Sequence, residues 1–542
     1  MKLRKITVNH FRSIENVEIN FPENTPVILF GANNVGKSNI LKAIDVLLGE
    51  RNPIYRDFED NDFFDRDREC YPNISLTACF DDVFYMSKKG SFCRSISFTT
   101  NKKMTNPEGN EILENTFHFE GSDQKAYISS ADRDKCTFIF IEAIRDIGRQ
   151  FSYYSQYSIL SKFSRKLHSA LVSSEKKELD KHYENIQKTF EMVPKFSEFH
   201  KNLIKAFSGN VDGFEHRLDV DLSAYDPNNY FQCLRIIAKE GKEKRSLDEF
   251  GTGEQQILLM SFIKAYAETF KNEAFVFGIE EPEAHLHPLA QKWLAKNIYL
   301  LNKGNVQVII TTHSPEFLDI ENLEGFVKVY KEKGITKVVQ LDSYSLTAKC
   351  LELKSNPDRT SASSILPFYK SNTFSDQLKG FFARKILLVE GPTELFSLPN
   401  YFANSSYDLI KEGVEIVSCS GKDQIARNYR LFTAYEIECF CLFDGDNNDP
   451  NKDLISTFEI EVGRMDNNPG SFNRDFSKKY GYFGVSYEEY LRENISDYEE
   501  EEKLLSSEDK VIRAKIISEN RKDFEPRFIE DIAAALGLKK TT

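Results

Sequence analysis

Two kinds of chemistry can be located in this sequence from residue types and their spacing, and the clearer one lies near the N-terminus. Gly31-Ala-Asn-Asn-Val-Gly36-Lys37-Ser38 matches the pattern Gly-x-x-x-x-Gly-Lys-Ser/Thr. It follows an apolar run at 26–30 and precedes helical spacing at 39–49, which is the context of a phosphate-binding loop. Lys37 would reach the β- and γ-phosphates of a nucleotide, and Ser38 would bind Mg²⁺. We expect nucleotide contacts from Gly31, Asn34, Gly36, Lys37, Ser38 and Asn39.

A pair of acids follows a second apolar run. AFVFGIEEPE at 274–283 reads as a buried strand that ends in Glu280 and Glu281. One carboxylate in such a place can hold Mg²⁺ through water, and the next can polarise the attacking water. We assign Glu280 to the first role and Glu281 to the second. The alternative is a strand that simply ends in acidic residues, and the phosphate-binding loop makes that reading the weaker one.

The second chemistry lies toward the C-terminus. Glu390 ends the apolar run at 386–389, Gly391 gives a tight turn, and Glu394 opens a helix. Asp444 and Asp446 follow another apolar run and are separated by one glycine. Since carboxyl ends of parallel strands meet at one edge, these four carboxylates suit one or two Mg²⁺ or Mn²⁺ ions. Such ions could activate water and stabilise the leaving oxygen of a phosphodiester. An Asp-x-Asp pair alone is a weak signal, because acidic loops commonly just face solvent.

Strands and helices must alternate to position these motifs. Apolar runs of strand length and helical spacings take turns over 247–330 and again from 385, which predicts an α/β fold with mostly parallel sheets. Residues 155–207 are rich in Lys and Glu, nearly free of Gly and Pro, and predict long helices inserted into the first unit. The acidic run at 497–509 predicts a solvated helix face or loop.

Composition excludes several classes of protein. The chain has 542 residues, 40% of them hydrophobic, which is enough for two or more domains with separate cores. A net charge of −13 argues against a protein that coats DNA through a global positive field. No run of 18 apolar residues and no apolar leader segment occur, and the nine scattered cysteines form no Cys-x-x-Cys pair. We therefore expect a cytoplasmic protein with reduced thiols and no membrane span.

Four motifs in order resemble the ABC/SMC-type ATPase head. Besides the phosphate-binding loop and Glu280-Glu281, the run from Leu247 through Gly251-Thr-Gly253 to Gln256 resembles a degenerate ABC signature loop before a helix. Thr312-His313-Ser314-Pro315 ends a strand and resembles the switch-histidine loop. The resemblance implies that Gly251 and Gly253 bind nucleotide held by an opposite subunit, and that His313 contacts the γ-phosphate. Two departures, Glu280 in place of Asp and the missing Leu-Ser-Gly-Gly, bear on the rate of hydrolysis more than on ATP binding.

Two further histidines lie in the same stretch of sequence. Glu283-Ala-His285-Leu-His287-Pro288 occupies the place of the dimer-contacting loop of that family. His285 and His287 could be read as a metal pair, but imidazole sites usually need further ligands nearby. We favour the loop reading.

Residues 383–450 resemble a TOPRIM domain, the fold of topoisomerase and primase catalytic centres. A head followed by TOPRIM resembles the OLD (overcoming lysogenization defect) family, which includes Gabija-type GajA proteins and retron-associated effectors. Its members are metal-dependent DNA endonucleases or nickases, often in anti-phage defence. The family adds a further acid and a lysine downstream. By order these are Glu488, with Glu489 as alternate, and Lys510, with Lys515 as alternate.

The resemblance implies an organisation and a set of partners. We expect an ATPase head at 1–345 with a helical insertion at about 155–215, a linker at 346–382, and a TOPRIM nuclease domain at 383–542. ATP, Mg²⁺ or Mn²⁺ at both sites, DNA, a homodimer or higher homo-oligomer, and a helicase or retron reverse transcriptase with its nucleic acid are the implied cofactors and partners. The main alternative is an SMC-like DNA-repair ATPase with an inactive TOPRIM remnant. A topoisomerase-like enzyme is the weakest reading, since no room remains for a DNA-gate domain.

Overall fold

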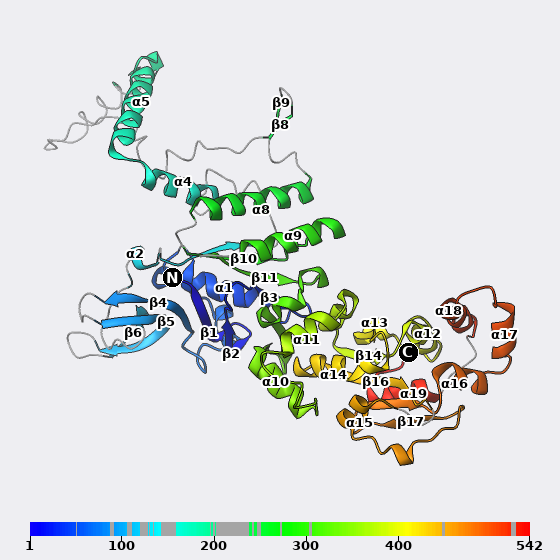
Figure 1. Cartoon of the computed structure of the whole chain (residues 1–542). Coiled ribbons are helices and arrows are strands. Elements are labelled where there is room, and N and C mark those ends of the chain that lie inside the picture. Colours follow the sequence, from blue (N-terminus) through cyan, green and yellow to red (C-terminus); the bar gives the residue numbers. More distant parts are fainter. Residues whose placement is uncertain are drawn as a thin grey trace. The chain divides into compact units, whose positions relative to one another are not determined.

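The structure is a computed structural model that falls into two compact units, residues 1–143 with 271–542 and residues 144–270. It describes residues 1–49, 51–86, 91–105, 111–119, 128, 130–133, 135–142, 159–195, 197–198, 201, 238–240, 243–245, 251–270, 274–302, 306–446, 450–521 and 527–541. Figure 1 labels the helices and strands.

An antiparallel sheet begins the larger unit. Its strands run in the order β2-β1-β4-β5-β6. Along β1 and β2 every second or third side chain is buried, so one face of the sheet belongs to the core, and Leu3, Ile6 and Val8 are fully enclosed. The bounds are Leu3–Phe11 (β1), Ile14–Asn20 (β2), Ser75–Met86 (β4), Ser91–Thr105 (β5) and Glu111–Phe119 (β6).

A mostly parallel sheet carries the predicted nucleotide motifs. Its order is β13-β12-β3-β11-β10-β7, and only the edge strand β13 runs antiparallel to its neighbour. Every residue of β3 and β11 is buried, as expected for strands covered on both faces. The bounds are Val27–Phe30 (β3), Thr137–Ile141 (β7), Phe275–Glu280 (β10), Val306–Thr312 (β11), Phe326–Glu332 (β12), Ile335–Gln340 (β13), Lys37–Leu48 (α1) and Pro288–Leu301 (α9).

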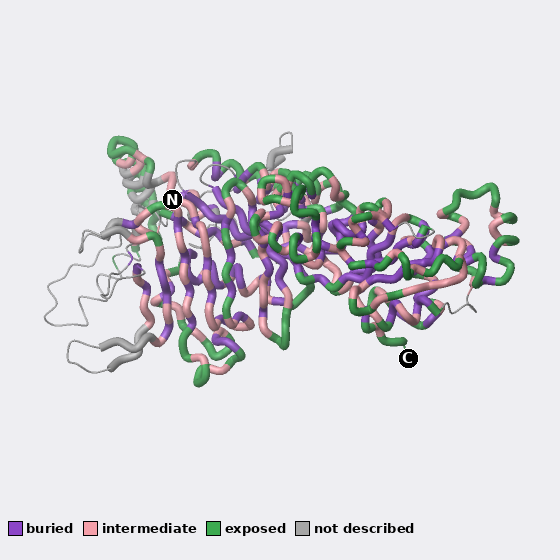
Figure 2. The backbone as a smooth tube through the Cα atoms, turned by 60° about the horizontal axis from the view of Figure 1, so that its bottom comes forward, coloured by how far each residue is buried: buried purple, intermediate pink, exposed green. Residues whose placement is uncertain are grey.

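A second mostly parallel sheet carries the C-terminal acids. Its order is β15-β14-β16-β18-β17, with β17 antiparallel at the edge. Most residues of β14, β16 and β18 are buried, as the purple stretches of Figure 2 show, whereas Tyr498 is the one buried residue of α17. The bounds are Lys385–Val389 (β14), Pro392–Asn404 (α12), Val414–Ser418 (β15), Ile425–Ala434 (α14), Glu438–Asp444 (β16), Phe472–Asp475 (β17), Tyr480–Phe483 (β18), Tyr487–Asn494 (α16), Tyr498–Leu504 (α17), Lys510–Asn520 (α18) and Arg527–Ala535 (α19). The predicted α/β class, with parallel sheets built by alternating strands and helices, is confirmed.

The segment between the two parallel sheets is largely helical. It contains α10 (Ser343–Glu352), α11 (Ile365–Asn372) and the 3-10 helix η8 (Ser375–Phe382). The Phe381 ring contacts rings of both sheets' elements: Phe30 of β3, Phe326 of β12, and Phe432 with Tyr435 at the end of α14. Lys328 of β12 donates hydrogen bonds to the carbonyls of Tyr435 (3.0 Å) and Glu436 (2.8 Å). The two sheets therefore share a packed aromatic junction.

The smaller unit is helical where it is described. It contains α4 (Ile159–Ala170), α5 (Ser173–Glu191) and α8 (Thr252–Thr269). Phe163 of α4 contacts Phe262, Tyr266 and Phe270, which follow helical spacing on α8 and its end. The predicted helices at 155–207 thus include α4 and α5, and much of 196–250 lies outside the described residues. None of the helices seen in the described part is both long and apolar enough to cross a membrane.

Phe381→Ala should destabilise the larger unit by about 3–5 kcal/mol, because the side chain is 1% exposed and its loss leaves a cavity among four rings. Thermal and urea unfolding of the full chain measure the change. Phe374→Ala is the matched control, since Phe374 lies in the same segment but is 57% exposed. Equal unfolding curves for both variants would contradict the aromatic junction.

Candidate active sites

Two glycines give the loop at 31–38 its shape. Gly31 has φ +141° and Gly36 has φ +110°, values that side-chain-bearing residues rarely adopt. A Cβ on Gly31 would lie 2.1 Å from the carbonyl oxygen of Val329, and one on Gly36 would lie 2.3 Å from Thr336 Oγ1. The loop therefore lies against β12 and β13 so closely that only glycine fits at both ends.

Lys37 and Ser38 lie at the start of α1, where the loop meets the acidic strand end. Lys37 Nζ donates to the carbonyls of Gly31 (2.9 Å) and Ala32 (2.8 Å), and burial lowers the pKa of Lys37 to about 8 against the attraction of three glutamates. Ser38 Oγ donates to Glu280 at the end of β10. A hydroxyl and a carboxylate that already meet can both ligate, directly or through water, the Mg²⁺ that accompanies a nucleotide. The donor set thus fits the implied nucleotide and its cation.

A chain of hydrogen bonds supports the same loop. Arg12 donates to Asn39 (3.4 Å), Asn39 donates to Ser13 (2.9 Å), Ser13 pairs with Thr336 (2.8 Å), and Thr336 donates to the carbonyl of Val35 (2.8 Å). Because the Thr336 proton goes to Val35, Ser13 is the donor to Thr336. Sequence reasoning assigned Asn39 but missed the other three side chains, which come from the β1–β2 turn and β13 and carry no motif.

The strand ends after β10 and β11 place an acid–histidine pair beside this loop. Glu281 Oε1 lies 3.6 Å from His313 Nε2, and Glu283 accepts a 2.6 Å hydrogen bond from the His313 backbone N–H. Burial, then the charge of Lys37, lowers the pKa of His313, so its neutral form is favoured. Burial raises the pKa of Glu283, a residue without a role in the sequence analysis. His313 and Glu283 could each orient water or a phosphate oxygen.

The glycines of the expected signature loop and His287 lie at the starts of two helices, α8 and α9. Gly251 precedes α8, Gly253 lies in its first turn, and Glu254 accepts a 3.0 Å hydrogen bond from the Gly251 N–H. Residues 247–250 of the signature lie outside the described residues, and the nucleotide contact of this loop stays a prediction. His287 is the N-cap of α9, where its Nδ1 accepts from the Ala290 N–H at 3.3 Å. That role accounts for His287 without a metal.

Four acids of the C-terminal sheet gather at the carboxyl ends of β14 and β16. Glu390 accepts a 2.8 Å hydrogen bond from the Asp444 N–H, and Asp444 accepts one of 2.9 Å from the Tyr487 N–H. Burial, then Glu390, Glu394 and Glu488, raises the pKa of Asp444 to about 9. Burial likewise raises the pKa of Glu390 to about 7 and that of Glu394 to about 8, with the neighbouring carboxylates adding to both. These groups are close enough to oppose one another's ionisation.

Gly445 allows the two aspartates to flank one backbone turn. Its Cβ would lie 2.6 Å from the carbonyls of Phe483 and Gly484, so only glycine lets β16 end this close to the end of β18. Asp446 then faces a different partner from Asp444 and forms an ion pair with Lys422. Lys422 is 14% exposed in its side chain and also lies 3.5 Å from the carbonyl oxygen of Asp444.

At the acidic cluster, sequence reasoning missed Lys422. It follows Gly421 in the loop after β15, and Gly421 has φ +125°. A Gly-Lys pair at the carboxyl end of a strand beside the acidic strands was the signal that could have found it.

The downstream pair also reaches the cluster. Glu488 in the first turn of α16 is 13% exposed and pairs with Lys510 of α18 at 2.6 Å. The charge of Glu488 contributes to the raised pKa values of Glu390, Glu394 and Asp444. The alternate lysine, Lys515, instead pairs with Glu519 on its own helix at 3.8 Å. The structure therefore brings Glu488 and Lys510 to the acids, while their roles stay predictions.

The carboxylates fit divalent cations by chemistry, though not by their present arrangement. Within the ranges that the structure describes, no three His, Cys, Asp or Glu side chains converge on one point as a metal requires. Of the five acids, Glu390 and Asp444 accept hydrogen bonds from backbone N–H groups, while Asp446 and Glu488 pair with Lys422 and Lys510. An all-oxygen set of mutually repelling acids is the donor type that Mg²⁺ and Mn²⁺ prefer.

A phosphate-binding loop in one parallel sheet and clustered acids at the strand ends of another define a P-loop ATPase-type head joined to a TOPRIM-type unit. The chain belongs to the AAA ATPase domain family, whose model matches residues 1–206 and 100–318. Residues 381–446 match the TOPRIM domain of overcoming lysogenization defect protein-like proteins. The predicted combination of an ATPase head and an OLD-type TOPRIM domain is confirmed.

Relatives of the same organisation align with most of the chain. An OLD nuclease of Thermus scotoductus is 25% identical over 467 residues, 82% of this chain and 82% of that protein. The Old nuclease of Escherichia phage P2 is 24% identical over 84% of this chain and 80% of its own length. Endonuclease GajA of Bacillus cereus is 20% identical over 73% of this chain and 66% of its own length.

Glu394→Gln should stabilise the metal-free chain above pH 8 and leave it unchanged below pH 4.5. The folded pKa of about 8 lies above the ordinary 4.5, so the folded protein loses stability as pH rises between these values, and an amide removes that loss. The gain is on the order of a few kcal/mol. Thermal unfolding in EDTA across this range measures it, beside Glu489→Gln as control. A pH-independent difference would contradict the raised pKa of Glu394.

Proposed function

We propose that this protein is an ATP-binding, metal-dependent DNA endonuclease or nickase of OLD type. The observation that carries the proposal is the group of buried acids at the ends of β14 and β16, with Glu488, Lys422 and Lys510 beside them. The homology of this chain to OLD nucleases and GajA endonucleases over most of its length supports the same activity.

The residues of the acidic cluster have separable tasks. Glu390, Glu394, Asp444, Asp446 and Glu488 would hold one or two Mg²⁺ or Mn²⁺ ions, which supply Lewis acidity toward water and the leaving oxygen. Asp444 Oδ1 accepts a hydrogen bond from the Tyr487 N–H. This bond fixes the rotamer of Asp444 and therefore the position of its other carboxylate oxygen. Lys510, 57% exposed in its side chain, can turn from Glu488 toward a phosphate and offset its growing charge.

The head would bind ATP through the loop at 31–38. Lys37 would exchange its carbonyl contacts for phosphate oxygens, Ser38 and Glu280 would hold Mg²⁺, and Glu281 with His313 would face the γ-phosphate and water. We propose that nucleotide binding regulates cutting, because β3, which leads into the loop, packs through Phe30 on the aromatic junction that also includes the end of α14.

The domain bounds, oligomeric state and biological role that we propose are those implied by the resemblance to the OLD family. We propose an ATPase domain at 1–345, a helical connection at 346–382 and a TOPRIM domain at 383–542, with homo-oligomerisation through the head. We further propose a cytoplasmic role in anti-phage defence, acting on DNA with a helicase or retron reverse transcriptase as the class of partner. The relatives named OLD nuclease and endonuclease GajA support the nuclease activity within this setting.

Purified protein should nick or linearise supercoiled plasmid with Mg²⁺ or Mn²⁺ and lose this activity in EDTA. Glu390→Ala and Asp444→Ala should abolish cutting while ATP binding persists, because the head motifs are separate. Removing one such ligand commonly lowers the rate about 100-fold or more. Agarose gels with and without ATP measure both the cutting and the direction of nucleotide control.

A matched pair tests the downstream acid. Glu488→Gln should lose cutting, whereas Glu489→Gln should retain it, because only Glu488 pairs with Lys510 beside the cluster. If the parent protein and every variant bind and turn over ATP with DNA but none cuts under any condition, the repair-ATPase alternative with an inactive TOPRIM remnant replaces this proposal.

Lys37→Ala should abolish ATP binding, since it removes the ammonium beside the loop carbonyls and its expected phosphate contacts. Equilibrium binding of a fluorescent ATP analogue measures the loss. Lys42→Ala, on the same helix α1, is the control and should bind normally. Undiminished binding by Lys37→Ala would show that the nucleotide site is misplaced.

A further inference from the structure

Of the two lysines that pair with acids of the C-terminal cluster, Lys422 is the more deeply buried. It begins the short 3-10 helix η9 (Lys422–Gln424) between β15 and α14. Its side chain is 14% exposed, whereas that of Lys510 is 57% exposed. The Lys422 ammonium forms an ion pair with Asp446 and donates to the carbonyl oxygen of Asp444 at 3.5 Å. An ammonium enclosed in this way is part of the cluster rather than a surface charge beside it.

Backbone hydrogen bonds tie the loop that carries Lys422 to the strand end that carries Glu390. The Gly421 N–H donates to the Glu390 carbonyl at 2.8 Å, and the Gln424 N–H donates to the Gly421 carbonyl at 3.1 Å. Ser420 has φ +63° and Gly421 has φ +125°, two left-handed values in a row that turn the chain sharply after β15. The backbone of Lys422 is therefore placed by the same strand ends that place the acids.

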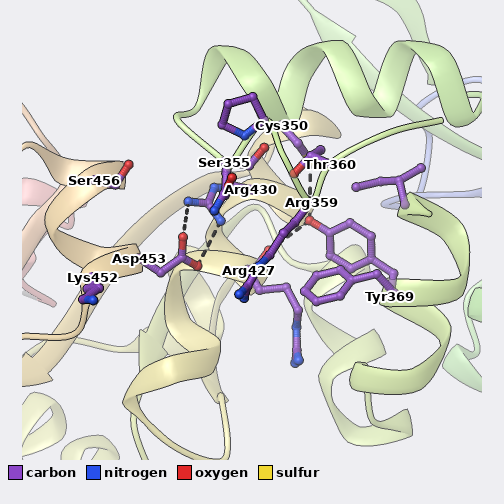
Figure 3. A pocket seen from close by; sticks show the side chains of 14 residues that line it. Cys350, Ser355, Arg359, Thr360, Tyr369, Arg427, Arg430, Lys452, Asp453 and Ser456 are labelled. Atoms are coloured by element: carbon purple, nitrogen blue, oxygen red, sulfur yellow. Dashed lines mark hydrogen bonds and ion pairs between the residues drawn. The ribbon is translucent and has the colours of Figure 1, made fainter. Parts of the chain in front are cut away.

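The helix that follows this loop is anchored on its other side. Arg430 of α14 donates hydrogen bonds of 2.7 and 3.0 Å to Asp453 of α15 (Lys452–Phe458), as Figure 3 shows. Tyr369 of α11 donates to the Arg427 carbonyl in the first turn of α14 at 3.3 Å. Because α14 is held by both neighbouring helices, the loop before it has little freedom to carry its lysine away from the acids.

Asp446 is held in the facing position by its own backbone. Its φ is +45°, and its N–H donates to the Val485 carbonyl at 2.9 Å. Its side chain is 52% exposed, so the carboxylate can be reached from solvent while it pairs with Lys422. A divalent cation that approaches this carboxylate must therefore meet the ammonium there, and two like charges beside one carboxylate repel each other.

The charge of Lys422 also acts on an acid that it does not pair with. Burial raises the pKa of Glu390 to about 7, while first the Asp444 N–H and then the charge of Lys422 act in the opposite direction. The lysine thus already supplies part of the positive charge that a metal ion would bring to the cluster.

We propose that Lys422 is a positioning residue that serves as an internal cation on Asp446, so that a divalent ion binds this carboxylate only by displacing the lysine. The proposal rests on the metal-dependent function proposed above. A first ion would be held by Glu390, Glu394 and Asp444, and a second would bind at Asp446 with lower affinity. The lysine would thereby set the metal concentration at which the cluster fills.

Mn²⁺ binding to the nucleotide-free full chain, followed by isothermal titration calorimetry, tests this proposal. The chain carries Ser38→Ala, which removes the hydroxyl expected to hold the cation of the head. Binding that is lost in Asp446→Asn defines the Asp446 site. Lys422→Met should tighten Mn²⁺ binding at this site by about tenfold, because a single charge within a few ångströms shifts ionic equilibria by about that factor or more.

Three controls separate the ion pair from general effects of charge. Lys422→Arg keeps the cation and should bind Mn²⁺ as the parent does. Lys411→Met removes the same charge from α13 (Leu409–Glu412), where Lys411 is exposed and lies before β15, at the opposite end of that strand from Lys422. It should also bind as the parent does. In the Asp446→Asn background, Lys422→Met should change the remaining binding by less than about threefold, since only screened, longer-range interactions are left.

The outcomes distinguish this inference from the function on which it rests. Tightening at the Asp446 site by Lys422→Met, or by Lys422→Gln if the methionine variant fails to fold by circular dichroism, supports the proposal. Unchanged or weakened binding there, or equal tightening in the Asp446→Asn background, overturns the proposal alone. If the parent shows no Mn²⁺ binding that depends on Asp444 or Asp446, both the proposal and the metal-dependent function are overturned.

Discussion

The burial of three neighbouring carboxylates at the strand ends is the main electrostatic constraint on the TOPRIM sheet. Burial and neighbouring acids raise the pKa values of Glu390, Glu394 and Asp444 together, which a core tolerates only with nearby donors or cations. Backbone N–H groups of Asp444 and Tyr487 supply part of that compensation, and Lys422 supplies a charge. In the function proposed here, a divalent cation held by these carboxylates would relieve their repulsion.

The loop at 31–38 has the opposite arrangement of charges, with one cation among several acids. There one buried ammonium, that of Lys37, lies near three glutamates, and its pKa falls because burial outweighs their attraction. Glycines at both ends of the loop let the backbone approach β12 and β13, and the chain of side chains from Arg12 to Thr336 holds it there. The loop is thus shaped before any phosphate arrives, which lowers the entropy lost on binding.

The aromatic junction makes the two sheets one packed body. Phe30 ends β3 immediately before Gly31, and its ring contacts both Phe381 and Tyr435. Lys328 adds hydrogen bonds from β12 to the carbonyls that end α14. Since α14 begins just after the Lys422 loop, one helix connects the neighbourhood of the nucleotide loop to that of the acids. Packed elements of this kind transmit small shifts because their interiors are dense.

The sequence by itself determined the motifs and the order of elements. Gly31–Ser38, Glu280 and the acids at 390, 394, 444 and 446 could be predicted because local patterns of apolar runs, glycines and acids mark strand ends, and parallel topology brings such ends together. Only the tertiary structure decided which distant side chains complete each site. Lys422, the choice of Glu488 with Lys510, and the chain through Ser13 and Thr336 depend on strand order and loop geometry.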